Sequence, residues 1–101
     1  MYSVEVSNNA DYDLDRILSY IVEDLASPQA ASSFTDEVYE CYVKLEQNPF
    51  IYEECRDPRL QREGYRRAVI KNYVMLYKIY ENRLVVVHRF FYGRQNYAEL
   101  I

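Results

Sequence analysis

The stretch Tyr65–Tyr92, "YRRAVIKNYVMLYKIYENRLVVVHRFFY", decides the fold. It holds three runs rich in Val, Ile, Tyr and Phe, residue types that favour β-strands. Short polar pairs, Lys71-Asn72 and Glu81-Asn82, separate the runs and predict tight turns. The sequence therefore predicts an antiparallel meander of three strands, at residues 65–71, 73–80 and 84–92.

Two amphipathic helices are predicted before the meander. After a short strand at residues 2–7, Asn8 or Asn9 is expected to cap the first helix. Its apolar stripe has helical spacing and consists of Leu14, Ile17, Leu18, Ile21 and Leu25. Ser27 followed by Pro28 predicts the start of the second helix. The apolar stripe of that helix consists of Ala31, Phe34, Val38, Cys41 or Tyr42, and Leu45.

The order of these elements predicts an α+β fold of two layers. A short N-terminal strand is followed by an antiparallel helical hairpin, the three-strand antiparallel meander and a short helical end at the C-terminus. Residues 48–64 are expected to be a loop. Because 101 residues are enough for one core but not for two, residues 1–101 should form a single domain.

The composition argues against several kinds of site. Cys41 and Cys55 form no CxxC pair and the chain has one histidine, so we expect neither a zinc site nor a disulfide framework. We predict two reduced cysteines in a cytoplasmic protein, with no metal and no cofactor. No run approaches the roughly 20 apolar residues of a membrane span, so we expect no membrane partner.

The charges are divided unevenly along the chain. Residues 1–55 carry twelve acids against two bases, whereas residues 56–94 carry ten bases against three acids. A formal net charge of −4 hides this asymmetry. The pattern indicates that one face of the domain meets an anionic partner, or else that the surface is simply dipolar.

The predicted meander is apolar on both faces. In residues 73–80, Val74 and Leu76 face one side, and Tyr73, Met75, Tyr77 and Ile79 face the other. In residues 84–92, Val85, Val87, Arg89 and Phe91 alternate with Leu84, Val86, His88, Phe90 and Tyr92. A helical hairpin covers only one face, so we expect another molecule to cover the other. The alternative is that the loop at residues 48–64 covers it.

Four segments together resemble the toxins of the RelE/ParE superfamily, the toxic halves of bacterial type II toxin–antitoxin pairs. They are "DYDLDRILSYIVEDLASPQAASSF" (11–34), "LEQNPF" (45–50), "GYRRAVIKNYVMLYKIY" (64–80) and "VVVHRFFYGRQNY" (85–97). The resemblance spans Ala10 to Leu100, in the expected order. It implies a small antiparallel sheet with a helical hairpin on one face, and an antitoxin that wraps the toxin in a hetero-oligomer.

The resemblance leaves two targets open. RelE-like members cut messenger RNA in the ribosome without a metal, using basic and tyrosine side chains for proton transfer and phosphate stabilisation. ParE-like members poison DNA gyrase and have no accepted catalytic residues. In the RNA-cutting pattern two basic residues fall on Arg66 and Ala68, and an arginine falls on Val74, so two of these positions cannot donate to a phosphate. An isoelectric point near 5 gives the chain a net negative charge, which disfavours entry into the anionic A site of the ribosome.

We therefore expect a ParE-like gyrase poison. The alternatives are a ribosome-dependent endoribonuclease, for which Arg66, Arg67, Arg94 and Tyr97 would be catalytic, and a non-toxic binding module of the same fold. Arg89 is expected to pair with an acid of the helices, and His88 to be structural. The residues predicted to contact a partner are Arg66, Arg67, Tyr73, Tyr77, Arg89, Tyr92, Arg94 and Tyr97.

Overall fold

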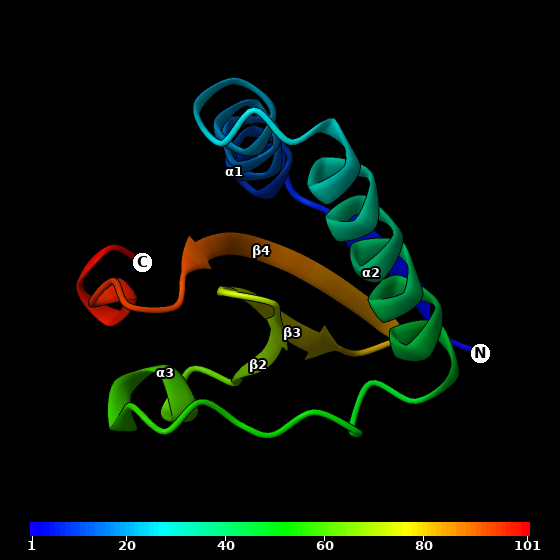
Figure 1. The fold of residues 1–101 in the computed structure, drawn as a ribbon. Helices are drawn as coiled ribbons and strands as arrows, with labels where there is room; N and C mark the ends of the chain where they lie inside the picture. The colour runs from blue at the N-terminus through cyan, green and yellow to red at the C-terminus, as the bar shows by residue number, and fades with distance from the viewer.

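The computed structural model describes residues 1–101 and has two layers, a four-stranded sheet and a helical hairpin (Figure 1). The helical elements are α1 (Asn8–Ser19), which continues as a π-helical segment (Tyr20–Asp24), α2 (Pro28–Gln47), α3 (Pro58–Arg62) and a 3₁₀ turn (Tyr97–Glu99). The strands are β1 (Ser3–Val6), β2 (Tyr65–Ile70), β3 (Tyr73–Tyr80) and β4 (Leu84–Tyr92). The predicted α+β fold, with its short helical C-terminal end, is confirmed.

Side-chain caps fix the starts of the helices. Ser7, rather than Asn8 or Asn9, caps α1: its Oγ accepts the Ala10 N–H at 3.1 Å and donates to the His88 carbonyl at 2.9 Å. This double role ties the start of α1 to β4. Ser27 caps α2 and Pro28 occupies its first turn, as predicted.

The sheet has the strand order β1-β4-β3-β2. β2, β3 and β4 form the predicted antiparallel meander, and β1 pairs parallel to the first half of β4. Lys71-Asn72 is a two-residue turn with Lys71 at φ 54°. The second turn has three residues rather than two, because Arg83 joins Glu81 and Asn82 before Leu84 pairs with Tyr80.

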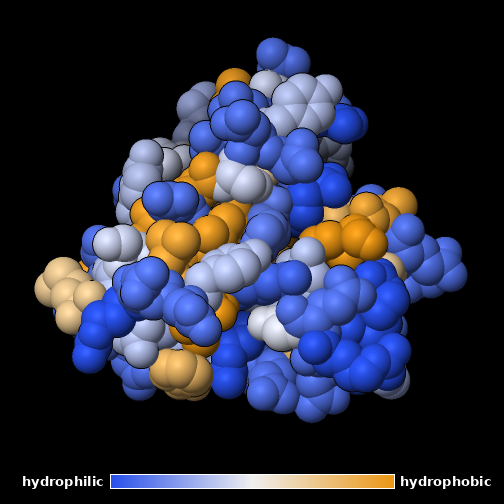
Figure 2. Space-filling model, turned by 180° about the vertical axis from the view of Figure 1, so that it is seen from behind, coloured by the Kyte–Doolittle hydropathy of each residue, from blue (hydrophilic) through white to orange (hydrophobic).

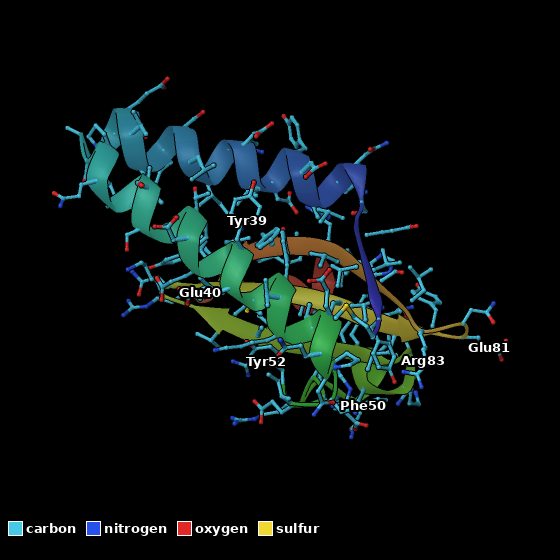
Figure 3. The ribbon with its side chains drawn as sticks, turned by 90° about the vertical axis from the view of Figure 1, so that its right-hand side faces the viewer. Tyr39, Glu40, Phe50, Tyr52, Glu81 and Arg83 are labelled. Atoms are coloured by element: carbon cyan, nitrogen blue, oxygen red, sulfur yellow. The ribbon has the colours of Figure 1, made fainter.

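The first core lies between the helical hairpin and the sheet (Figure 3). The predicted stripe of α2 is buried throughout: Ala31, Phe34, Val38, Cys41 and Leu45. It packs against Met75 and Tyr77 of β3 and Val85 and Val87 of β4. Both cysteines are free and buried, on opposite sides of the sheet.

The other face of the sheet is covered by the chain itself. A second core joins Cys55 and Leu60 to Tyr65 of β2, Val74 and Leu76 of β3, and Phe91 of β4. The prediction that another molecule covers this face is therefore wrong. The alternative holds because residues 48–64 are not a plain loop: Asp57 accepts the Leu60 N–H at 3.0 Å and Pro58 begins α3, which places Leu60 on the sheet.

A β-bulge changes which face the end of β4 presents. Leu76 pairs with Arg89 and Tyr77 with Val87, so His88 is an extra residue without a partner on β3. The predicted alternation therefore holds up to Val87 and fails beyond it. Phe90, predicted to lie opposite Val85 and Val87, packs with them in the first core, while Phe91 enters the second.

Candidate functional site

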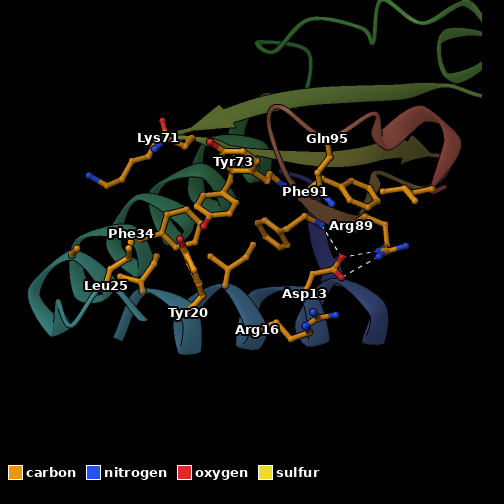
Figure 4. A pocket seen from close by; sticks show the side chains of 17 residues that line it. Asp13, Arg16, Tyr20, Leu25, Phe34, Lys71, Tyr73, Arg89, Phe91 and Gln95 are labelled. Carbon is orange, nitrogen blue, oxygen red and sulfur yellow. Dashed lines mark hydrogen bonds and ion pairs between the residues drawn. The ribbon is translucent and has the colours of Figure 1, made fainter. Parts of the chain in front are cut away.

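A groove of about 960 Å³ opens between the tip of the helical hairpin and the C-terminal end of β4 (Figure 4). We call it the hairpin groove. One wall comes from α1 and the π-helical segment, the floor from Phe34 of α2, and the other wall from the β2–β3 turn and β4. Its lining is mostly apolar and aromatic, and includes Ile17, Tyr20, Ile21, Leu25, Phe34, Tyr73, Phe90, Tyr92 and Leu100.

The π-helical segment gives the groove its exposed apolar wall. The Leu25 N–H donates to the Tyr20 carbonyl at 3.2 Å, a bond that spans five residues instead of the four of an α-helix. The extra residue shifts the face that follows it. Leu25, which the sequence predicted to share the core stripe of Ile21, is instead 56% exposed and lines the groove.

An ion pair fixes the distance between α1 and β4 at one end of the groove. Asp13 accepts from Nε of Arg89 at 2.6 Å and from Nη2 at 3.1 Å, and also from the Phe90 N–H at 3.0 Å. Asp13 thus supplies a hydrogen-bond acceptor to the part of β4 that extends beyond β1 and lacks a strand partner on that side. Its hydrogen bonds to the guanidinium also raise the pKa of Arg89. The predicted pairing of Arg89 with a helix acid is confirmed.

Aromatic rings form the sheet side of the groove. Tyr73 packs edge-on against Phe34 at 5.3 Å between ring centroids and against Tyr92 at 5.8 Å. Tyr92 remains 40% exposed. Of the residues predicted to contact a partner, the structure brings Tyr73, Arg89 and Tyr92 together here.

Sequence reasoning missed the other half of this surface. Tyr20, Leu25 and Leu100 were not predicted as contact residues, although each is about half exposed and lines the groove. The signal available for Leu25 was its place at the very end of the helical stripe, directly before the Ser27-Pro28 break.

The remaining predicted contact residues lie elsewhere. Tyr77 is fully buried and donates its hydroxyl hydrogen to the Pro49 carbonyl at 2.6 Å, so the prediction that it contacts a partner is wrong. Arg66 lies on the helix side of β2, where it donates to the Tyr52 carbonyl at 2.7 Å. Arg67 lies on the opposite face, 3.6 Å from a Glu53 oxygen. Arg94 is exposed after β4.

The residues proposed for RNA cleavage do not form one constellation. Arg66 and Arg67 point to opposite faces of the sheet, and Tyr97 stacks on Phe91 with its ring centroid at 5.8 Å. Val74, which replaces an arginine of the RNA-cutting pattern, is 3% exposed and sealed in the second core. This packing leaves no space for a phosphate beside Val74.

The bulged His88 joins an aromatic cluster on the second face of the sheet. Its Nε2 shares a hydrogen bond of 2.9 Å with the Tyr80 hydroxyl, and its ring packs edge-on against Tyr65 at 5.6 Å. Burial lowers the pKa of His88, and the positive charge of Lys78 lowers it further. These contacts favour a neutral imidazole with a structural role.

We expect acid to destabilise the domain through His88. A pKa below the unfolded value of about 6.5 means that the unfolded chain binds a proton more readily, so the stability is present above that pH and is lost as the pH falls below it. In urea unfolding at pH 7.5 and pH 5.5, the wild-type chain should lose more unfolding free energy between the two pH values than His88→Gln. Equal losses in the two proteins would contradict this role.

Two further structural features bear on the kind of site. No three His, Cys, Asp or Glu side chains converge in an arrangement that could hold a metal ion. None of the helices is both long and apolar enough to span a bilayer.

Comparison with known proteins identifies the family. The family described as "ParE toxin of type II toxin-antitoxin system, parDE" matches residues 4–97. A solved chain described as "Chromosomal ParDE TA system from P. aeruginosa" shares the fold with a TM-score of 0.69 at 20% identity, over 89% of this chain and 94% of that one. No curated protein sequence matches the chain. The chain belongs to the ParE toxin family of type II toxin–antitoxin systems.

Proposed function

We propose that this protein inhibits growth by poisoning DNA gyrase and that a cognate antitoxin neutralises it by filling the hairpin groove. The observation that carries the proposal is the groove itself. An isolated domain gains free energy by burying apolar side chains, yet Tyr20, Leu25, Tyr92 and Leu100 remain 40–56% exposed around one hollow. Such a surface fits an apolar segment of a partner protein.

Gyrase is favoured over messenger RNA as the target because the second face of the sheet is packed. A metal-free ribonuclease needs several donors around one phosphate. Here the corresponding face holds Val74, Leu76 and Phe91 beneath Tyr97, and the two arginines of β2 point apart. Membership of the ParE family, rather than of a RelE-like one, supports the same target. Inhibition by the toxin and its neutralisation by the antitoxin would both take place in the cytoplasm.

Arg94 and Tyr97 separate the two targets by experiment. If the protein binds gyrase, Tyr97→Phe should leave inhibition unchanged, because the ring that stacks on Phe91 stays and only a hydroxyl is lost. Arg94 is exposed, and its replacement by Ala should weaken inhibition by about 10-fold if it contacts gyrase. The measurements are a gyrase supercoiling and cleavage assay and, in parallel, cleavage of ribosome-bound message.

The ribonuclease hypothesis makes the opposite prediction. Loss of a proton donor or of a phosphate-binding arginine should lower the cleavage rate by ~10²-fold or more. The gyrase proposal fails if purified toxin cuts ribosome-bound message, leaves gyrase untouched, and loses its toxicity with Tyr97→Phe.

A further inference from the structure

The side of the helical hairpin that faces away from the sheet carries exposed aromatic and acidic side chains. Both α1 and α2 bury one stripe against the sheet, so the residues on the opposite side of each helix point to solvent. We call this surface the outer hairpin face. It consists of Asp11, Tyr12, Asp15, Asp36, Tyr39 and Val43, all of them exposed, and none of these residues lines the hairpin groove.

A pair of tyrosines lies at the centre of the outer hairpin face. The rings of Tyr39 and Tyr42 meet edge-on with 5.9 Å between their centroids, and Figure 3 places Tyr39 between α1 and α2. Tyr39 is 62% exposed, whereas the Tyr42 hydroxyl is buried and has no hydrogen-bond partner. Burial raises the pKa of Tyr42, and the negative charge of Asp11 on the facing helix raises it further. A carboxylate therefore lies close to the tyrosine pair.

The acids of the outer hairpin face are not neutralised within the chain. Residues 8–47 hold nine acids and only two bases. Asp13 and Glu37 form ion pairs with cations of the sheet layer. The three acids of the outer hairpin face make no ion pair at all. This face is therefore strongly negative as well as aromatic.

An exposed tyrosine ring beside carboxylates suits a guanidinium or ammonium group. The chain itself uses this chemistry on the same face, where the Arg16 guanidinium lies over the Tyr12 ring at 5.8 Å from its centroid. No cation of the chain lies over Tyr39. A guanidinium from a partner, placed between Tyr39 and Asp11, would stack on a ring, meet a carboxylate and give the Tyr42 hydroxyl a donor.

Other occupants fit the outer hairpin face poorly. A second copy in a symmetric dimer would bring carboxylates against carboxylates. The basic half of another copy offers little in exchange, because six of the ten bases in residues 56–94 already form ion pairs. Nucleic acids and anionic lipids carry phosphates, which the acids repel. The chemistry of this face therefore selects a protein with exposed cations.

We propose that the toxin docks on gyrase through the outer hairpin face, which receives a basic patch of gyrase with an arginine or lysine seated between Tyr39 and Asp11. An enzyme that acts on DNA holds the phosphates with exposed lysine and arginine side chains, so gyrase offers the required cations. This inference rests on the proposed poisoning of gyrase, and it names the surface of the toxin that makes the contact.

Asp15→Lys tests the charge of the face, with Glu81→Lys as the matched control. Each substitution reverses one exposed acid that makes no ion pair, but Glu81 lies in the turn between β3 and β4, far from the hairpin (Figure 3). Binding of purified gyrase to the wild-type toxin should weaken as the salt concentration rises. At low salt, Asp15→Lys should bind gyrase about 10-fold more weakly than Glu81→Lys.

Tyr39→Ala tests the aromatic part of the face, with Tyr39→Phe as its control. We expect Tyr39→Ala to lower both gyrase affinity and inhibition of supercoiling by about 10-fold, whereas Tyr39→Phe keeps the ring and should act as the wild type does. Because Tyr39 is 62% exposed and does not line the hairpin groove, the melting temperature and the antitoxin affinity should stay unchanged in both variants.

The outcomes separate this inference from the proposed function. If Asp15→Lys and Glu81→Lys bind gyrase equally, or Tyr39→Ala binds it as the wild type does, the outer hairpin face is not the docking surface, although gyrase remains the target. Loss of antitoxin affinity in Tyr39→Ala, with gyrase affinity unchanged, would assign the face to the antitoxin instead. A wild-type toxin that neither binds nor inhibits gyrase would overturn the proposed function, and this inference with it.

Discussion

Asp13→Ala should lower the unfolding free energy by about 2–4 kcal/mol, since it removes one partner of a largely buried ion pair. The Asp13 side chain is 12% exposed and that of Arg89 27%. The substitution leaves the guanidinium without its carboxylate and the Phe90 N–H without an acceptor. In a domain of this size, a loss of this magnitude lowers the melting temperature by roughly 10 °C or more.

Asp15→Ala is the matched control. Asp15 lies two residues along α1, is exposed, and makes no ion pair or side-chain hydrogen bond. Its removal should change stability by no more than about 0.5 kcal/mol. Adding Arg89→Leu to Asp13→Ala should recover part of the loss, because the unpaired charge is then gone as well. Similar melting temperatures for Asp13→Ala and Asp15→Ala would show that the pair does not hold α1 to β4.

Leu25→Asp should weaken binding of the cognate antitoxin by about 30-fold to 1,000-fold. If an apolar partner segment fills the hairpin groove, it would bury the new carboxylate without a hydrogen-bond partner, which is costly. Because Leu25 is 56% exposed in the free toxin, the substitution should leave its fold intact. Affinity can be measured by titration calorimetry, and the function by growth rescue in cells that express both proteins.

Val43→Asp provides the control for that substitution. Val43 is 51% exposed on α2 and does not line the groove. The Val43→Asp variant should bind the antitoxin with the same affinity as the wild-type chain. If the two variants bind equally well, the antitoxin does not use the groove, whatever the toxin's target.

The predicted effects on stability and on antitoxin binding both depend on how the helical hairpin packs on the sheet. The same packing determines which side chains lie on the outer surface. Seen from behind, strongly hydrophilic side chains gather where α3 lies, whereas apolar side chains appear near the C-terminus (Figure 2). The basic half of the sequence contributes to this hydrophilic side, but four of its arginines lie within 4 Å of Glu53, Glu54 or Glu63. The charge asymmetry read from the sequence is thus partly neutralised within the fold.

The sequence by itself determined the elements whose signals are local. Alternating β-formers gave β3 and β4 their bounds, and the Ser27-Pro28 start and apolar stripe gave α2 its position and buried face. α3 also carried a local signal, since Asp57 caps it and Pro58 begins it. Five residues are too short for a helical period, however, so only its packing through Leu60 distinguishes it from a loop.

The tertiary structure alone decided which faces are open. The alternation of residues along a strand predicts which side chains share a face of the sheet. The β-bulge at His88 reverses that assignment for the residues after it, and the sequence of β4 does not reveal the bulge because the bulge arises from pairing with β3. Tyr77 and Tyr92 both lie in runs of β-forming residues, so the sequence does not distinguish them. In the structure Tyr77 is buried in the core, where its hydroxyl donates to the Pro49 carbonyl, whereas Tyr92 lines the groove. Whether a side chain is buried depends on which distant parts of the chain pack against it. The periodicity of residues along one strand does not show those contacts.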